Sequence, residues 1–441
     1  MTSGTLTILI FGIALILILS GNPIAFALMG TAAVVGLGQM STKCFDMFQS
    51  GLYTQATSYS MLAVPLFVFM GNMIESTGIT RRMFDAIYVW MGRMKGGLLI
   101  VTVIIGTILA ACVGVIAASV TMLALIGLPM MMERAYDKRL ACGAICASGS
   151  LGILIPPSVL LVMYGPAASL SVGKLFAGAI GPGLLLALLY ILYNVIMCVI
   201  DPHKAPSATK EETAVPLAQK LKLLFTSLLP PLLLIFAVLG SIMLGIAAPT
   251  EAAAVGALAS IIMAFFYKSF SYANLRKALK STAKNYAMVQ MIIWAAKAFT
   301  SLFLRMGCGT LITQTLANMQ GGRGTAFLII MIITFILGMF IDWIGIIMIM
   351  IPIITPWAIK AGFDQVWFAM MIIVNLQFSF ITPPFAYAIF FLKDTTRPEW
   401  GITTGDIIKG ILPYLALITI ALILCIIFPF IITWLPSVSI G

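Results

Sequence analysis

Oxygen-bearing side chains gather where the long apolar segments of this chain are interrupted by proline and glycine. The segments LACGAICASGSLGILIPPS and MMIIVNLQFSFITPPF both show this pattern. A break of this kind leaves backbone carbonyl and amide groups without helical partners, and in lipid each unsatisfied group is costly. Small hard cations bind such oxygen atoms, and the N-termini of half-helices attract anions. The breaks therefore predict sites for a cation and for an anion.

The two breaks and two nearby turns supply the candidate ligands. Candidate contacts for an anionic substrate are the polar side chains beside the Pro-Pro pairs: Ser148, Ser150, Ser158, Asn375, Gln377 and Ser379. Candidate cation ligands, through side-chain or backbone oxygen atoms, are Gly114, Ser119, Pro156, Asp342, Gly345, Thr382 and Pro383. Hydroxyl groups in helices also bond to their own backbone, so each Ser or Thr has this second interpretation.

Asp342 is the most specific of these residues. It lies in FILGMFIDWIGIIMIMIP, with apolar residues on both sides. A carboxylate inside a membrane is expensive and is functional by default, so Asp342 predicts a cation ligand or a substrate-site role. The alternative is an ion pair with Lys297, which also lies in an apolar span. Glu251, near the start of another span, is interpreted as an ordinary helix cap.

Prolines and glycines recur along the chain at a fixed spacing. Pro156 and Pro383 are 227 residues apart, and the same offset relates Pro157 to Pro384, Pro129 to Pro356, Asp137 to Asp364, Gly178 to Gly405 and Gly183 to Gly410. Such residues weaken helices, so their repetition at one register predicts two copies of one structural unit. Duplicated halves with broken helices are typical of secondary transporters.

The composition places the chain in a membrane. Of its 441 residues, 61% are hydrophobic and 9% are charged, whereas soluble domains carry about 25% charged residues. A span needs only about 20 apolar residues, so the length allows ten or more spans. The formal net charge of +11 indicates basic loops on the cytoplasmic side rather than nucleic-acid binding.

The apolar runs predict ten spans and two re-entrant hairpins. The spans are expected at 4–21, 22–41, 61–79, 139–169, 176–200, 224–246, 248–266, 286–304, 365–392 and 409–435. The spans at 139–169 and 365–392 are the broken ones. The hairpins are expected at 97–132 and 324–359. Basic clusters flank both ends of 97–132, so this segment is expected to enter and leave on one side.

These elements form an all-α polytopic fold with an inverted repeat of about five spans and one hairpin in each half. The halves are residues 1–200 and 223–441, joined by a polar cytoplasmic linker at 201–222. Both termini are expected to be periplasmic, because this orientation puts most of the 25 Lys and Arg residues inside. Amphipathic segments at 42–60, 80–96 and 268–284 are expected to lie along the interface.

No catalytic pair or cofactor motif accompanies these features. The single histidine, His203, lies in the polar linker, and the seven cysteines are scattered without metal-ligand spacing. We therefore expect neither an enzyme nor a cofactor. An ion channel would need a continuous polar path instead of paired turns and breaks.

Three segments of the chain resemble the large membrane subunit of the tripartite ATP-independent periplasmic (TRAP) transporters. These segments are GIAAPTEAAAVGALAS at 245–260, GILIPPS at 152–158 and FIDWIGIIMIMIPIITP at 340–356. Where the family often has Thr-Pro-Thr-Glu, this chain has Ala-Pro-Thr-Glu from Ala248 to Glu251, which puts only one hydroxyl contact in doubt. The resemblance covers essentially the whole chain.

The resemblance implies a sodium-driven transporter in the bacterial inner membrane that imports an organic acid. It implies an elevator mechanism, a separate small four-helix membrane subunit and a soluble periplasmic substrate-binding protein. Na⁺ is then the coupling ion, with Asp342 as one ligand. The alternative is a self-sufficient sodium-coupled carboxylate carrier without a binding protein, and an ion channel is a further alternative.

Overall fold

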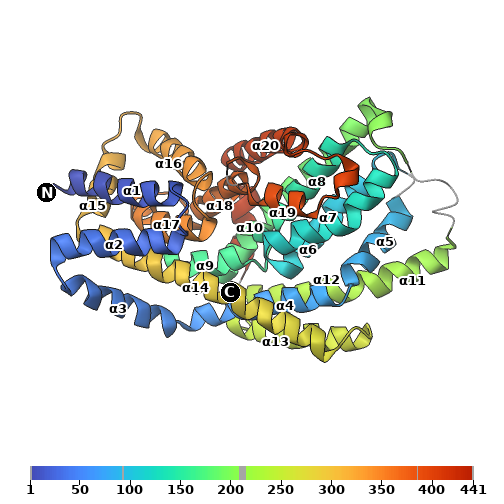
Figure 1. The fold of residues 1–441 in the computed structure, drawn as a ribbon, viewed down its shortest axis with the longest axis horizontal. Coiled ribbons are helices and arrows are strands. Elements are labelled where there is room, and N and C mark those ends of the chain that lie inside the picture. The colour runs from blue at the N-terminus through green and yellow to red at the C-terminus, as the bar shows by residue number, and fades with distance from the viewer. Residues whose placement is uncertain (1, 92–93, 208–214, 385, 440–441) are drawn as a thin grey trace.

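The computed structural model describes residues 2–91, 94–207, 215–384 and 386–439, and these residues form helices and connecting turns without a β-strand. Figure 1 shows the helical arrangement. Within the described residues, eight helices are long and apolar enough to cross a membrane. Large apolar side chains such as Phe236, Leu188 and Phe266 are exposed on outer helices, as expected of a surface that faces lipid. The predicted all-α membrane fold is confirmed.

The first half of the chain runs from α1 to α10. Its helices are α1 (Ser3–Leu19), α2 (Ile24–Met40), α3 (Lys43–Ala56), the 3-10 helix η1 (Tyr59–Leu62), α4 (Ala63–Ser76), α5 (Ile79–Met91), α6 (Gly97–Val113), α7 (Ile116–Glu133), α8 (Lys138–Ser150), the 3-10 helix η2 (Leu151–Ile153), α9 (Val159–Ala168) and α10 (Val172–Ile200).

The second half follows the short helix η3 (Pro202–Lys204) and runs from α11 to α21. Its helices are α11 (Leu217–Ser227), α12 (Leu229–Met243), α13 (Pro249–Phe266), α14 (Tyr272–Arg305), α15 (Cys308–Ala317), α16 (Gly322–Gly338), α17 (Trp343–Lys360), α18 (Gln365–Ile381), α19 (Tyr387–Thr395), the 3-10 helix η4 (Pro398–Trp400), α20 (Thr404–Ile427) and α21 (Phe430–Val438).

Helices α6 and α7 form an antiparallel pair joined by a two-residue turn, and both ends of this pair lie at one place. The Gly96 amide donates to the Ala205 carbonyl at 3.0 Å, and the Asp137 amide donates to the Lys204 carbonyl at 2.8 Å. Adjacent residues of the segment after α10 therefore hold the beginning and the end of the pair together. This is the geometry of a hairpin, and it lies where the sequence predicts one, at 97–132.

Helices α16 and α17 form the corresponding pair in the second half. The guanidinium carbon of Arg323, at the start of α16, lies 5.5 Å from the centre of the Phe363 ring, which follows α17. Both ends of this pair therefore also lie together, at the predicted hairpin 324–359. We call the two pairs hairpin 1 (α6 and α7) and hairpin 2 (α16 and α17).

The helices that follow the two hairpins begin with the same cap. Asp137 accepts hydrogen bonds from the Arg139 and Leu140 amides at the start of α8, and Asp364 accepts one from the Trp367 amide at the start of α18. A carboxylate at this position satisfies amides that have no helical partner. These aspartates are related by the 227-residue offset, so a repeated sequence feature performs the same structural role in both halves.

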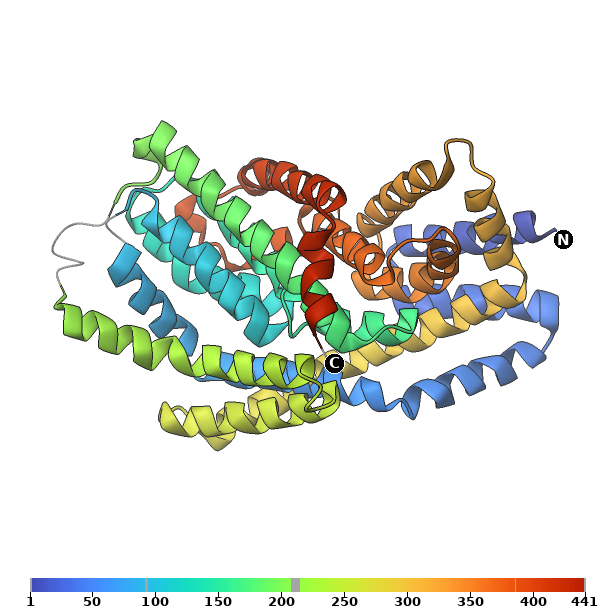
Figure 2. The same cartoon turned by 180° about the vertical axis from the view of Figure 1, so that it is seen from behind.

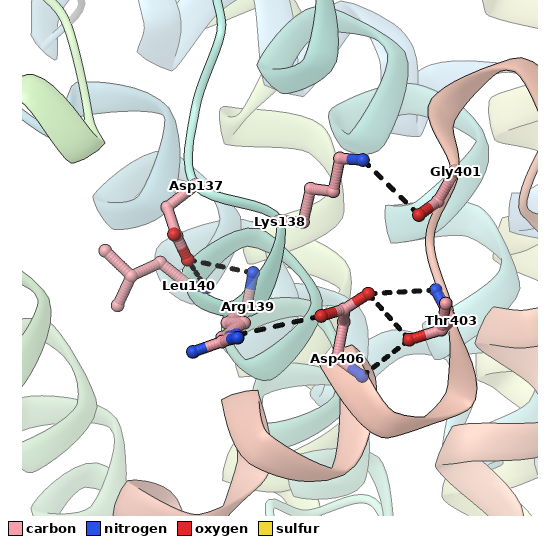
Figure 3. A network of polar contacts seen from close by, with 7 residues as sticks. All are labelled: Asp137, Lys138, Arg139, Leu140, Gly401, Thr403 and Asp406. Atoms are coloured by element: carbon pink, nitrogen blue, oxygen red, sulfur yellow. Dashed lines mark hydrogen bonds and ion pairs between the residues drawn. The ribbon is translucent and has the colours of Figure 1, made fainter.

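The two halves are in close contact between α8 and α20. A side chain at Gly143 would place its Cβ 2.2 Å from the Gly410 carbonyl oxygen, so the two backbones are in direct contact. At the start of these helices, Lys138 Nζ donates to the Gly401 carbonyl at 3.3 Å, and Arg139 Nε lies 3.7 Å from Asp406 Oδ1 (Figure 3). This contact makes α8 and α20 one unit.

An outer layer of long helices packs along one side of this unit. Helix α4 packs against α13 and α14, α14 packs against α2, and α12 packs against α13 (Figures 1 and 2). Helix α13 begins with the cap expected at Glu251, whose Oε2 accepts a hydrogen bond from the Ala248 amide at 2.9 Å. The cap interpretation of Glu251 is therefore confirmed.

Several predicted boundaries are wrong. The expected interfacial segment 268–284 and the span 286–304 form one continuous helix, α14, because no proline or glycine separates them. The linker 201–222 ends in helix, since α11 begins at Leu217, and its residues 208–214 lie outside the described part. Helix α15 was not predicted, and the last span 409–435 is divided between α20 and α21 at Phe428.

Candidate functional site

The tip of hairpin 1 rests on the break between α8 and α9. Gly114 ends α6 with a φ of 63°, a left-handed conformation that favours glycine. A Cβ on Gly114 would lie 3.2 Å from the Pro157 carbonyl oxygen and 3.8 Å from the Ser158 Cα. The peptide bond between Pro156 and Pro157 is cis. The turn of the hairpin and the Pro-Pro break, predicted separately as ligand regions, are thus in contact. We call this region the first junction, and the tip of hairpin 2 with the second break the second junction.

Ser119 lies against the first break, whereas Ser148 packs on Gly106 in the middle of α6. The Ser119 hydroxyl is buried, donates to the Val115 carbonyl at 3.2 Å, and lies 3.1 Å from the position that a Cβ on Gly152 would take. The Ser148 hydroxyl is buried and, among the described residues, has no hydrogen-bond partner. Ser148 therefore retains a free ligand oxygen, which is consistent with its predicted role.

Ser150 and Ser158 satisfy their hydroxyl groups within their own segment. Ser150 Oγ donates to the Ala147 carbonyl at 2.8 Å, and Ser158 Oγ donates to the Ile153 carbonyl. Both hydroxyls therefore bond to the backbone of their own segment, which is the alternative expected for Ser and Thr in helices. Each oxygen still has lone pairs, but its proton is already donated to the backbone.

The tip of hairpin 2 places Asp342 at the first residue before α17. Its Oδ2 accepts a long hydrogen bond, 3.4 Å, from the Ile344 amide, and its carboxylate lies close enough to Tyr387 to interact electrostatically. Tyr387 begins α19, immediately after the second break. In the part of the chain that is described, Asp342 forms no ion pair with Lys297, so that alternative is not supported.

The second break holds several buried polar groups without partners. Both amide atoms of Gln377 and the hydroxyls of Ser379 and Thr382 have no hydrogen-bond partner within the described residues. Ser379 packs directly on Gly338, at the end of α16, because a Cβ on that glycine would overlap its hydroxyl. Asn375 differs, since its Nδ2 donates to the Met331 carbonyl at 2.8 Å. Buried polar groups without partners are costly, so these residues remain the candidates for ligand contacts.

Of two further predicted ligands, Gly345 packs against apolar side chains and Pro383 lies at a cis peptide bond. A Cβ on Gly345 would lie 3.0 Å from Ile341 Cγ2 and 3.5 Å from Ile24 Cγ2, so this glycine allows close packing against apolar side chains. Pro383 precedes a cis peptide bond to Pro384, as Pro156 does in the first half. The structure therefore brings Gly345 into the apolar core rather than into the junction.

The two junctions are interleaved at the centre of the molecule. Helix α9, after the first break, packs on α17 of hairpin 2, while α19, after the second break, packs on α7 of hairpin 1. Cys146 Sγ, in α8, donates to the Ala388 carbonyl of α19 at 3.5 Å. Each half thus supplies part of the surroundings of the other half's break.

Each break provides oxygen atoms and the N-terminus of a half-helix. The hydroxyls of Ser148, Ser379 and Thr382 and the amide oxygen of Gln377 are neutral donors of electron pairs, and Asp342 adds a carboxylate. Hard cations such as Na⁺ prefer oxygen ligands of this kind. The half-helices α9 and α19 begin at the breaks, and helix N-termini favour an anion.

Sequence reasoning missed three residues of the junctions. Tyr387 begins α19 directly after the second break, Gly338 makes room for Ser379, and the buried Thr334 hydroxyl lacks a partner among the described residues. The 227-residue offset relates Thr334 to Thr107, so the repeat itself was a signal for this residue. No sequence signal distinguished Gly338 from the other glycines of apolar helices.

Comparison with known proteins gives concordant results. The model of the DctM component of the tripartite ATP-independent periplasmic transporter matches residues 11–431. The C4-dicarboxylate TRAP transporter large permease protein DctM of Pseudomonas aeruginosa is 33% identical over 395 residues, which cover 88% of this chain and 87% of that protein. Its namesake from Rhodobacter capsulatus is 31% identical over 455 residues, 98% of each chain.

A solved structure has the same fold. The crystal structure of the Alcanivorax borkumensis YdaH transporter, described as having an unusual topology, matches with a TM-score of 0.60. The two chains are 15% identical, and the match covers 96% of this chain and 98% of the other. At this identity the likeness concerns the fold.

Proposed function

The chain belongs to the DctM component family of the tripartite ATP-independent periplasmic transporters, and from this membership we propose that it carries an organic acid anion across the membrane, driven by sodium. The observation that supports this most directly is the pair of interleaved junctions. They combine a carboxylate at Asp342, buried oxygen atoms without partners and the N-termini of half-helices. A cation and an anion are both stabilised by such surroundings.

Sodium binding would organise the anion site. Asp342 would contribute the charged ligand, and the hydroxyls and carbonyls of the breaks would complete the coordination. A bound Na⁺ offsets the desolvation cost of the carboxylate and fixes the hairpin tip relative to α19. The anion would then bind between the tips, near Ser148 and Gln377. Uptake and sodium entry become coupled because each ligand improves the site of the other.

The packing supports a division into a moving unit and a fixed layer. Hairpins 1 and 2 pack on the broken helices, and α8 is in backbone contact with α20, so these elements would move together. The layer of α2, α4, α13 and α14 would remain fixed. An elevator movement of the first group along the second would expose the junctions alternately to the two sides.

The transporter class is tripartite, so this large subunit would work with two partners. We infer a small four-helix membrane subunit and a periplasmic substrate-binding protein that delivers the anion. The relatives named above transport C4-dicarboxylates, which supports an organic acid as the substrate. The membership places the chain in the bacterial inner membrane, and we propose that both termini face the periplasm.

Reconstitution tests this function. Proteoliposomes that contain the chain, its small membrane subunit and the binding protein loaded with radiolabelled dicarboxylate are expected to accumulate label under an inward Na⁺ gradient. They are expected not to do so under a K⁺ gradient of equal size. The control omits the binding protein. Robust sodium-driven uptake by the chain without partners would replace this proposal with the self-sufficient carrier, and current without saturable uptake would favour a channel.

A further inference from the structure

A cavity with charged side chains lies between α3, α14, α17 of hairpin 2 and the C-terminal end of α9. Its volume is about 820 Å³, and three of its lining residues are cations: Lys43, Lys297 and Arg305. Asp46 is the one carboxylate among the lining residues. The cavity is therefore large enough for a small organic anion, and its charged side chains carry a net positive charge.

The helices on both sides of the cavity turn polar stripes toward it. On α14 the stripe consists of Lys297, Thr300, Ser301, Leu304 and Arg305, a spacing of three and four residues that defines one helix face. On α3 the lining residues follow the same spacing: Lys43, Asp46, Met47, Ser50, Gly51 and Thr54. Two polar faces that meet across an open volume in a membrane protein indicate a water-filled path rather than packing.

Lys297 is the residue that most needs an explanation. It is half-buried within a candidate membrane span, and no carboxylate of the described residues forms an ion pair with it. A charged group inside a membrane segment faces a cavity or a partner, because lipid does not solvate it. Lys297 and Arg305 are eight positions apart in α14, so they lie about 12 Å apart along the helix axis. The two cations thus line the cavity at two levels of the same helix.

The cavity adjoins the moving unit. Met348 and Pro352 of α17 line it, and Thr300 Oγ1 donates to the Met348 carbonyl at 3.0 Å. Helix α17 begins at Asp342 and leads from the tip of hairpin 2 to its base. A ligand in the cavity therefore lies against the same helix that carries the proposed sodium ligand.

We propose that this cavity is an anion vestibule, in which Arg305, Lys43 and Lys297 attract the carboxylate groups of the substrate before it reaches the junctions. The proposal rests on the proposed function, because it assumes an anionic substrate. Clefts lined by charge of one sign raise the local concentration of an opposite ion about tenfold or more. The vestibule selects by charge, so any small dicarboxylate enters it.

Cysteine reactivity measures the charge selectivity directly. The reporter variant Ser301→Cys in phosphatidylcholine nanodiscs is treated with a sulfonate-bearing or a trimethylammonium-bearing methanethiosulfonate, and each rate is divided by that of a free thiol. The seven native cysteines are buried, so unmodified protein gives the background. The anionic reagent is expected to react about tenfold faster than the cationic one. Ser20→Cys is the matched control, because Ser20 is exposed and lies outside the cavity. This reporter is expected to react with both reagents at similar relative rates.

Charge removal identifies the residues responsible. Adding Lys297→Gln or Arg305→Gln to the reporter is expected to lower the anion preference at least about threefold, and Lys297→Arg is expected to preserve it. Succinate is expected to slow the anionic reagent more than sodium chloride of equal ionic strength. An unchanged preference in both Gln variants, or no effect of succinate, overturns the vestibule.

The lipid composition of the nanodisc distinguishes a substrate anion from a lipid headgroup as the occupant of the cavity. If replacing phosphatidylcholine by phosphatidylglycerol abolishes the preference, a lipid headgroup occupies the cavity and the vestibule for substrate is wrong. Labelling requires no transport, so its outcome is independent of the uptake assay. Preserved sodium-driven uptake together with a lost anion preference would reject the vestibule alone, whereas an anion preference without uptake would reject the proposed function alone.

Discussion

At the scale of single residues, hydrogen bonding separates positions that the sequence made equivalent. Ser148, Ser150, Asn375 and Gln377 form two pairs related by the 227-residue offset, and all four were predicted to contact substrate. In the structure Ser150 and Asn375 donate to backbone carbonyls, whereas Ser148 and Gln377 lack partners among the described residues. The type and position of these residues were predictable. Whether each side chain has a hydrogen-bond partner depends on neighbours that only the packing reveals.

Asn375 and Gln377 allow a matched pair of substitutions. Asn375→Leu is expected to destabilise the protein by about 0.5–1.5 kcal/mol, because it removes the buried hydrogen bond from Asn375 to the Met331 carbonyl. Gln377→Met removes only unsatisfied groups, so thermal stability in the membrane is expected to stay equal or to rise, while uptake is lost. Thermal unfolding and proteoliposome uptake of both variants check this. A clear loss of stability in Gln377→Met with unchanged uptake would contradict a ligand role.

At the scale of helices, the Pro-Pro pairs lie at the breaks that they predicted, and changes in polarity were less reliable. The junctions lie at Pro156 and Pro383, because proline and glycine alter backbone geometry directly. The boundary placed near residue 285 was wrong, because the change from basic to apolar residues leaves the α14 backbone unaffected. Close approaches such as that of Gly143 to α20 were invisible in the sequence, since they depend on a distant partner.

The contact between α8 and α20 leads to a prediction about packing. Gly143→Ala is expected to destabilise the protein by about 1–3 kcal/mol, because the new methyl group would meet the Gly410 backbone. Gly30→Ala, inside α2, is the matched control, since a Cβ there meets nothing within 4 Å. The control is expected to be neutral or slightly stabilising, because alanine favours helix. Equal thermal stability of the two variants would mean that the α8 and α20 contact is looser than described.

At the scale of the whole molecule, the proposed transport mechanism depends on two hairpins that enter from opposite sides of the membrane. The base of hairpin 1 lies at Lys204 and Ala205, and the base of hairpin 2 lies at Arg323 and Phe363. The sequence predicted the hairpins from charge and length, and their antiparallel geometry is now described. The division into halves at 201–222 and the orientation in the membrane remain predictions, because no lipid fixes the direction of the helices.

Side-specific labelling checks this orientation. Lys95→Cys and Arg139→Cys are expected to react with a membrane-impermeant thiol reagent only from the cytoplasm. Arg323→Cys and Lys360→Cys are expected to react only from the periplasm, because an inverted repeat places the two bases on opposite sides. All four side chains are exposed, and the native cysteines are buried. Labelling of all four from one side would exclude the inverted arrangement.

The most direct test of the central claim is sodium binding to the purified chain. Increasing NaCl is expected to raise the thermal unfolding temperature above that in choline chloride of equal ionic strength, because a ligand of the folded state stabilises it. Asp342→Asn is expected to shift the half-maximal sodium concentration upward about tenfold, which corresponds to about 1.4 kcal/mol. Asp364→Ala, which removes the N-cap of α18, is expected to lower stability without changing that concentration. Equal stabilisation by choline, or an unchanged sodium midpoint in a well-folded Asp342→Asn protein, would contradict a sodium site at the tip of hairpin 2.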